Sequence, residues 1–194
     1  MELQKALKIA NYLCKGLAPY CERIAIAGSV RRGKADVKDI ELLAIPKRET
    51  RGEPIQDLFG NVTAPALQVN MLCEGLKRVP KIRWIKPGTS EIIDWPLKNE
   101  AKYFRGYIDS CDIKVDIFTA RECTWGYQMA IRTGPAEFSQ ALVQKWLRLG
   151  YQGQGGMLTK YGKLVPVREE KDLFDLLYME YVLPHKRESQ LILR

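Results

Sequence analysis

The stretch that decides the fold lies near the N-terminus and reads Gly28-Ser29-Val30-Arg31-Arg32-Gly33, followed by Asp39-Ile40-Glu41. An apolar segment at residues 23–27 precedes it, and a second apolar segment at residues 36–45 carries the two acids. Both segments have the composition of short strands, and the glycine between them is typical of a tight turn. The sequence therefore predicts a strand, a Gly-Ser turn followed by two arginines, and a second strand.

Two acids on that second strand, with a third further along the chain, indicate a site for divalent metal ions. Side chains alternate along a strand, so Asp39 and Glu41 are expected on one face and Ile40 on the other. Asp116 lies within another apolar stretch, residues 113–118. If the two strands are neighbours, the three carboxylates repel one another unless cations neutralise them, and such oxygen ligands select Mg²⁺ or Mn²⁺. The plain alternative is three unrelated acids on strand edges.

The Gly28-Ser29 turn is suited to binding a phosphate. Backbone N–H groups and a hydroxyl can face the phosphate there, and Arg32 can add charge-assisted hydrogen bonds. Residues 28–34 also fit Gly-x-x-x-x-Gly-Lys, which is most of a P-loop. We reject the P-loop because Ala35 stands where a P-loop has Ser or Thr, and because a strand follows where a P-loop has a long helix.

Composition limits the class of protein. The 194 residues are enough for one medium domain or two small ones, and a formal charge of +8 suits a polyanionic partner. Five cysteines without a Cys-x-x-Cys pair indicate reduced thiols. There is no apolar signal core at the N-terminus and no run near the ~20 apolar residues of a membrane span. These features predict a cytoplasmic protein, bacterial or viral in a host cell, without a membrane partner.

The pattern of apolar residues along the chain predicts an α/β (α+β) fold, with a mixed sheet flanked by helices. Helices are expected at residues 3–17, 67–79, 125–132, 138–149 and 169–178. Strands are expected at residues 23–27, 36–45, 81–85, 91–95, 102–108 and 112–119, and a hairpin at 153–167. The charged residues 47–60 predict a loop. Strands give way to helices near Arg121, which predicts a domain over residues 1–121 and a small helical domain with a short hairpin over residues 122–194.

These motifs together resemble the family X DNA polymerases of the nucleotidyltransferase superfamily. Residues 28–33 with Asp39-x-Glu41 look like their first active-site motif, and residues 114–118 look like the strand with their third carboxylate. Residues 133–138 are similar to their Thr-Gly nucleotide-binding turn, and residues 169–187 to their C-terminal signature. The resemblance covers nearly the whole chain. It is to minimal members that lack the lyase and helix-hairpin-helix domains, because the chain begins at the palm.

The resemblance implies a nucleotidyltransferase palm at residues 1–121 and a thumb-type domain at 122–194 that binds the nascent base pair. It implies a monomeric, template-directed DNA polymerase that adds dNTPs to a primer 3′-OH by two-metal phosphoryl transfer, filling short gaps in DNA repair, with primer-template or gapped DNA as partner. The implied catalytic metal ligands are Asp39, Glu41 and Asp116, the last nearest the primer hydroxyl. The implied dNTP contacts are Gly28, Ser29 and Arg32 for the triphosphate and Thr133 and Gly134 for the sugar. The expected DNA contacts are Lys114, Lys81 and Arg83, of which the last two lie in residues 77–86, where bases alternate with apolar residues. A solvated strand edge explains that stretch equally well.

The chain also departs from the family pattern, and two other functions stay open. Many relatives have Asp where this chain has Glu41, and Ile131-Arg132 replaces an aromatic pair before the Thr-Gly turn. One alternative is a template-independent nucleotidyltransferase that acts on DNA ends, RNA, protein or a small molecule. The other is a DNA-end-binding module with a relic site, and the retained, mutually repelling acids argue against it.

Overall fold

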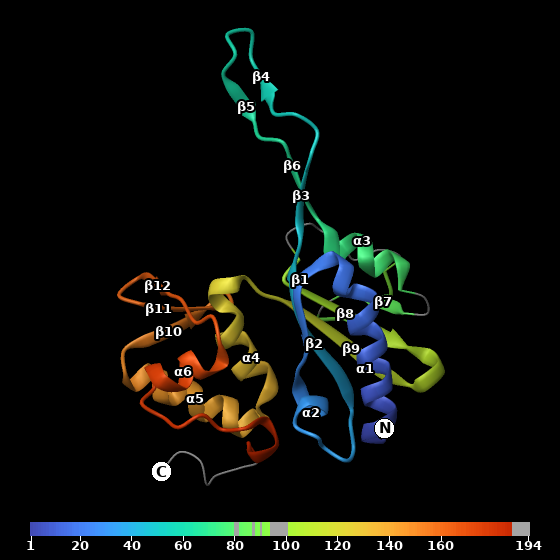
Figure 1. Ribbon diagram of the computed structural model, residues 1–194, viewed down its shortest axis with the longest axis vertical. Helices are drawn as coiled ribbons and strands as arrows, with labels where there is room; N and C mark the ends of the chain where they lie inside the picture. The colour runs from blue at the N-terminus through green and yellow to red at the C-terminus, as the bar shows by residue number, and fades with distance from the viewer. Residues whose placement is uncertain (80–81, 87, 90, 94–100, 188–194) are drawn as a thin grey trace.

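A five-stranded mixed sheet forms the centre of the fold. The computed structural model describes residues 1–79, 82–86, 88–89, 91–93 and 101–187, and within these ranges the sheet has the order β1-β2-β9-β8-β7 (Figure 1). Its strands are β1 (Cys21–Ile26), β2 (Asp39–Pro46), β7 (Arg83–Ile85), β8 (Tyr103–Ile108) and β9 (Ile113–Thr119). Strands β2 and β9 run parallel, and the other neighbours are antiparallel. The two acid-bearing segments are therefore adjacent strands.

Helices cover both faces of this sheet. On one face, α1 (Leu3–Leu17) and α3 (Met71–Arg78) pack against fully buried residues such as Ile40 and Val115. On the other face, α4 (Trp125–Thr133) packs against Leu43 and Phe118. The burial of both faces explains why β2 becomes continuously apolar after Glu41. The expectation of a mixed α/β fold, with a mixed sheet flanked by helices, is confirmed.

The C-terminal part of the chain has a core of its own. It contains α5 (Ala136–Arg148), the three-stranded sheet β10 (Tyr151–Gln154), β11 (Met157–Lys160) and β12 (Lys163–Val165), and α6 (Glu170–Leu176). Phe138 and Trp146 of α5 pack there with Phe174 of α6. Helix α4 contributes to this core as well as to the sheet, because Ala130 faces α5 and α6 while Met129 faces the sheet. Helix α4 therefore packs with both parts of the molecule.

A two-stranded arm replaces the loop expected at residues 47–60. Its strands are β3 (Arg48–Arg51) paired with β6 (Leu67–Asn70), and β4 (Ile55–Gln56) paired with β5 (Val62–Ala64). Figure 1 shows it projecting far from the rest of the fold. The loop prediction was wrong because this pairing joins residues some twenty positions apart, which local composition does not reveal. The helix expected from residue 67 begins at Met71, where Asn70 caps it by accepting a hydrogen bond from the Leu72 N–H.

Smaller differences concern turns and strand ends. The expected turn after β1 is a single helical turn, α2 (Gly28–Arg31). Of the strand expected at 91–95, Ile92 forms an isolated bridge with Ile85, and residues 94–95 lie outside the described residues. Short 3₁₀ turns occupy Ala18–Tyr20, Asp109–Cys111, Glu122–Thr124 and Pro184–Lys186. All five cysteines are free thiols. In the part of the chain that the structure describes, no helix has the length and apolar character needed to cross a membrane.

Candidate active site

The three acids predicted as metal ligands lie together on β2 and β9. Glu41 is the direct register partner of Asp116, and Asp39 pairs two positions earlier with Lys114. All three acids line one cavity of about 600 Å³, which we call the carboxylate cavity. Its other lining residues are Lys102, Tyr103, Arg105, Phe118, Thr119, Gln128, Arg132, Gly155 and Gly156. The cavity therefore lies between the acid-bearing face of the sheet, helix α4 and the turn between β10 and β11.

Strand alternation explains why the acids share this face. Ile40 and Leu42 on β2 have no exposed surface and point into the core under α1. The residues between and beside them point to the opposite face, so Asp39 and Glu41 meet the cavity. On β9, Val115 is fully buried in the same core, and Asp116 takes the other direction. The apolar pattern of the two strands thus fixes the direction of all three carboxylates.

The acids are partly removed from water and repel one another. Burial, with the charges of Asp39 and Asp116, raises the pKa of Glu41 to about 7. Burial and the charge of Asp116 also raise the pKa of Asp39. A divalent cation would lower both pKa values and offset the repulsion, because it is attracted to the ionised form of each of the three carboxyl groups.

Two arginine side chains already neutralise part of the negative charge of these acids. Arg105, on β8, donates two hydrogen bonds to Asp116, from Nε to Oδ1 and from Nη2 to Oδ2, each at 2.9 Å. The Tyr103 hydroxyl donates a third, at 2.7 Å to Oδ1. The Arg132 guanidinium lies 3.6 Å from the ring centroid of Phe118, and burial lowers its pKa although the charge of Glu41 opposes this. Among the described residues, no three acidic, histidine or cysteine side chains are posed as a ready set of metal ligands.

The turn predicted to bind phosphate packs directly on one of the acids, Glu41. Gly28 has a φ of +62°, and a Cβ there would lie 2.0 Å from Glu41 Oε2, so only glycine fits between the turn and the carboxylate. The Ser29 hydroxyl is buried and has no hydrogen-bond partner within the described residues. A buried, unpartnered hydroxyl is costly unless a ligand satisfies it.

The Thr-Gly turn at the end of α4 meets this phosphate turn. Arg32 donates a hydrogen bond of 2.6 Å to the carbonyl oxygen of Thr133, and Arg31 donates one of 2.6 Å to its hydroxyl. A Cβ at Gly134 would lie 2.8 Å from atoms of Phe138, so the turn packs closely on α5. The five residues predicted to contact a dNTP therefore come together from segments about a hundred residues apart.

A buried ionic network supports this junction. Glu170 accepts hydrogen bonds of 2.6 Å from Arg31 and from Arg187, and one of 3.0 Å from the Tyr181 hydroxyl. Arg187 is fully buried, and Glu170 is only 6% exposed. The network joins α2, at the edge of the carboxylate cavity, to α6 and the last described residues of the chain. Glu169 adds an exposed, two-pronged pair with Arg23 of β1.

The two described residues that were predicted to contact DNA, Lys114 and Arg83, lie on different strands of the sheet. Lys114 is exposed and lies beside Asp39. Its positive charge partly opposes the rise in the pKa of Asp39. Arg83 lies on the edge strand β7, where it pairs with Asp109 and covers the ring of Tyr107. Lys81 lies outside the described residues. Of the two described residues, Lys114 adjoins one of the acids and Arg83 does not.

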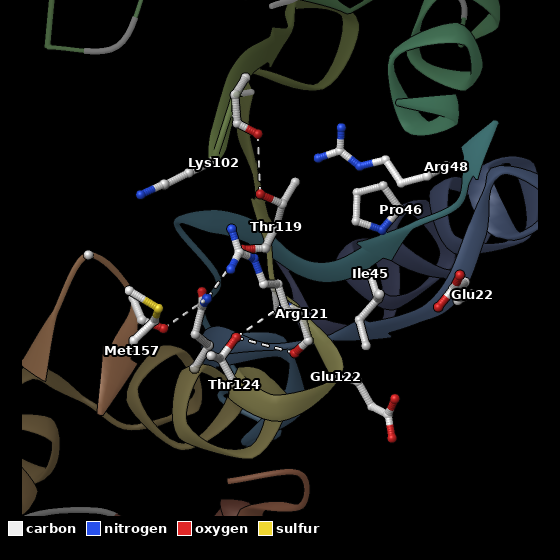
Figure 2. Close-up of a pocket in the computed structure, with 15 residues that line it drawn as sticks. Glu22, Ile45, Pro46, Arg48, Lys102, Thr119, Arg121, Glu122, Thr124 and Met157 are labelled. Carbon is white, nitrogen blue, oxygen red and sulfur yellow. Dashed lines mark hydrogen bonds between the residues drawn. The ribbon is translucent and has the colours of Figure 1, made fainter. Parts of the chain in front are cut away.

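A second pocket of about 340 Å³ continues the carboxylate cavity. The two share Lys102, Thr119, Gln128, Gly155 and Gly156. Figure 2 shows Arg48, Lys102 and Arg121 around this second pocket, each from a different segment, together with Glu22 and Glu122. We call it the basic pocket, because three cationic side chains line it against two acidic ones.

Sequence reasoning missed Tyr103, Arg105 and Lys102. Residues 103, 105 and 107 alternate with buried residues along β8, which was a signal that they share a face. Their position opposite Asp116 depends on the register of β8 against β9, which the sequence did not supply.

The chemistry of the acids, though not their present arrangement, is that of a site for a hard divalent cation. They supply carboxylate oxygens in a polar cavity, and Glu41 lies beside a glycine that has room for nothing larger than hydrogen. No protein-family model matches this chain. A search of curated proteins likewise finds no match.

Proposed function

We propose that this protein is a nucleotidyltransferase with a palm-type catalytic domain, and that it adds dNTPs to a primer 3′-OH under the direction of a DNA template. The observation that carries the proposal is the juxtaposition of Asp39, Glu41 and Asp116 in one cavity. Burial and mutual repulsion raise the pKa values of Asp39 and Glu41 even with Arg105 paired to Asp116, and a divalent cation would offset both effects. The resemblance of the motifs to the family X polymerases supplies the substrate class and the repair of short gaps as the setting.

In this proposal, Asp39, Glu41 and Asp116 hold the metal ions. Bound Mg²⁺ or Mn²⁺ would supply the positive charge that stabilises the transferring phosphoryl group. The primer 3′-oxygen forms a bond to the α-phosphorus of the dNTP, and the bond to the bridging oxygen breaks to release pyrophosphate. Asp116 would lie nearest the primer hydroxyl and would accept its proton. The residues mainly position charge, since phosphoryl transfer requires little covalent chemistry from a protein.

The phosphate turn holds the triphosphate. The Ser29 hydroxyl is the group available for a phosphate oxygen, because it is buried and unpartnered among the described residues. Arg32 contributes positive charge from the end of the same turn, and Gly28 keeps the turn close to Glu41. Thr133 and Gly134 would line the sugar, and α5 would face the nascent base pair.

DNA as the partner is supported by charge. The chain carries 31 basic and 23 acidic residues. The basic pocket adjoins the carboxylate cavity, so a phosphate backbone passing through the first would bring a strand to the second. Binding to such a surface weakens steeply as salt rises.

The test is extension of a labelled primer with Mg²⁺, comparing a one-nucleotide gap with single-stranded DNA and supplying each dNTP separately. The proposal predicts insertion of the complementary dNTP alone, and only at the gap. Insertion of all four dNTPs, or extension of the single strand, would instead identify a template-independent transferase. No extension of either DNA would contradict a DNA polymerase.

A further inference from the structure

The most acidic part of the site already holds a cation of the protein's own. Both carboxylate oxygens of Asp116 accept hydrogen bonds from Arg105, whose register position on β8 is directly opposite. The Tyr103 hydroxyl donates to the same carboxylate. These three hydrogen bonds occupy both oxygens of the carboxylate that the proposed function takes as a metal ligand.

Arg105 is placed so that it can leave. Its side chain is 37% exposed, whereas that of Asp116 is 6% exposed. Its guanidinium also lies 5.4 Å from the ring centroid of Tyr103 and is attracted to the charge of Asp39. Arg187, by contrast, is fully buried, between Glu170 and the rings of Phe138, Phe174 and Tyr181. The guanidinium of Arg105 therefore lies at the rim of the carboxylate cavity, with solvent beside it.

The charges that line the cavity indicate that a metal ion would replace Arg105 at Asp116 rather than bind beside it. Its lining includes three acids, Asp39, Glu41 and Asp116, and three bases, Lys102, Arg105 and Arg132. A divalent cation in contact with Asp116 would lie against a guanidinium that holds the same oxygens, and like charges at that separation repel strongly.

We propose that Arg105 is a positioning residue that holds Asp116 in the metal-free protein and releases it when a divalent metal ion binds. The bond that breaks is the two-pronged ion pair, and the guanidinium moves to the solvent side of the cavity. Tyr103 keeps its hydrogen bond and maintains the orientation of the carboxylate during the exchange. This inference rests on the proposed function only in taking Asp116 as a metal ligand.

The exchange predicts that removing Arg105 strengthens metal binding. Mn²⁺ is titrated into the full-length protein, and free Mn²⁺ is followed by electron paramagnetic resonance. Arg105→Met is expected to bind Mn²⁺ about tenfold more tightly than wild type, the order of change expected when a partly exposed charge-assisted pair stops competing. Arg105→Lys keeps the positive charge but loses the two-pronged hydrogen bonding to Asp116. Its affinity for Mn²⁺ should therefore lie between those of wild type and Arg105→Met.

The control is Lys102→Met, which removes one positive charge from the same cavity without breaking a bond to an acid. Its effect should stay below about threefold, because exposed charges are screened. If Arg105→Met binds Mn²⁺ no more tightly than Lys102→Met, while Asp116→Asn weakens binding, the exchange is wrong and the metal site stands. If wild type and Asp116→Asn bind Mn²⁺ equally, the metal site is wrong and the exchange with it.

A second measurement follows Arg105 directly. Its Nε–H resonance in an NMR spectrum, assigned by its disappearance in Arg105→Lys, should shift to a solvent-exposed position when wild type is saturated with Mg²⁺. The same addition should leave it unchanged in Asp116→Asn. A resonance that does not move in wild type at saturating Mg²⁺ would contradict the exchange.

Discussion

The substitution Glu170→Gln should strongly destabilise the fold, although it hardly changes the shape of the side chain. The substitution removes one negative charge from the network that accepts hydrogen bonds of 2.6 Å from Arg31 and from Arg187. Arg187 is fully buried, so its charge would lose its only charged partner in the described structure. An uncompensated buried charge is among the most costly defects that a substitution can create.

The expected loss is about 3–5 kcal/mol in the free energy of unfolding, the usual effect of removing one partner from a buried pair. For a chain of this length, each kcal/mol lowers Tm by about 2–4 °C, so the decrease should be roughly 6–20 °C. The neighbouring Glu169→Gln is the matched control, since its pair with Arg23 is exposed at both ends, 58% and 41%. Such a pair contributes less than about 1 kcal/mol.

The assay is thermal unfolding of both variants at pH 7, followed by circular dichroism. A decrease for Glu170→Gln no larger than that for Glu169→Gln would refute the reasoning, because the buried network would then contribute nothing beyond a surface pair.

The same variant makes a prediction about pH. Burial alone raises the pKa of Glu170, but the hydrogen bonds from Arg31 and Arg187 outweigh it, so its pKa in the folded protein lies below the ordinary value of 4.5. A carboxyl group of this kind stabilises the fold above its unfolded pKa, and the stabilisation is lost as the pH falls through the folded pKa. The difference in Tm between wild type and Glu170→Gln should therefore be full at pH 7 and should narrow below pH 4.5.

Three further substitutions test the site. Glu41→Gln should raise Tm in metal-free buffer, because it removes a repelling buried charge, and should abolish any increase of Tm by Mg²⁺; a lower Tm would contradict the repulsion. Gly28→Ala should cost about 1–3 kcal/mol more than Gly33→Ala, because the strain of a positive φ is common to both but only the Cβ at position 28 would clash, with Glu41. Equal effects would show that the contact with Glu41 is unimportant. Ser29→Ala should leave Tm unchanged or raise it by a few degrees, because it removes a costly buried hydroxyl that has no partner in the described residues. It should also raise the dNTP concentration needed for the half-maximal rate, and an unchanged concentration dependence would exclude Ser29 as a phosphate contact.

The central strands and the face of the acids could be predicted from the sequence, because both depend on local alternation. Ile40 and Leu42 alternate with Asp39 and Glu41, and that pattern is enough to assign the two faces. The first helix followed in the same way from its apolar spacing, and its bounds, Leu3–Leu17, are those expected.

What the sequence could not provide are the contacts that depend on register or on distant pairing. Arg105 meets Asp116 only because β8 and β9 align at those positions, and a shift of one residue would turn it to the other face. The arm depends on pairing between β3 and β6, and Arg31 meets Glu170 across 139 positions. Composition near each residue carries no record of such partners.

The central claim, that Asp116 acts with the two acids of β2 on a metal-bound nucleotide, is tested most directly by single-nucleotide insertion at a DNA gap in Mg²⁺. We expect Asp116→Asn to lower the rate by at least about a hundredfold while gapped DNA still binds, since the variant loses charge stabilisation and little else. Asp109→Asn, which removes an exposed acid paired with Arg83 outside the carboxylate cavity, should insert at the wild-type rate. Insertion by Asp116→Asn at the rate of Asp109→Asn would contradict the account.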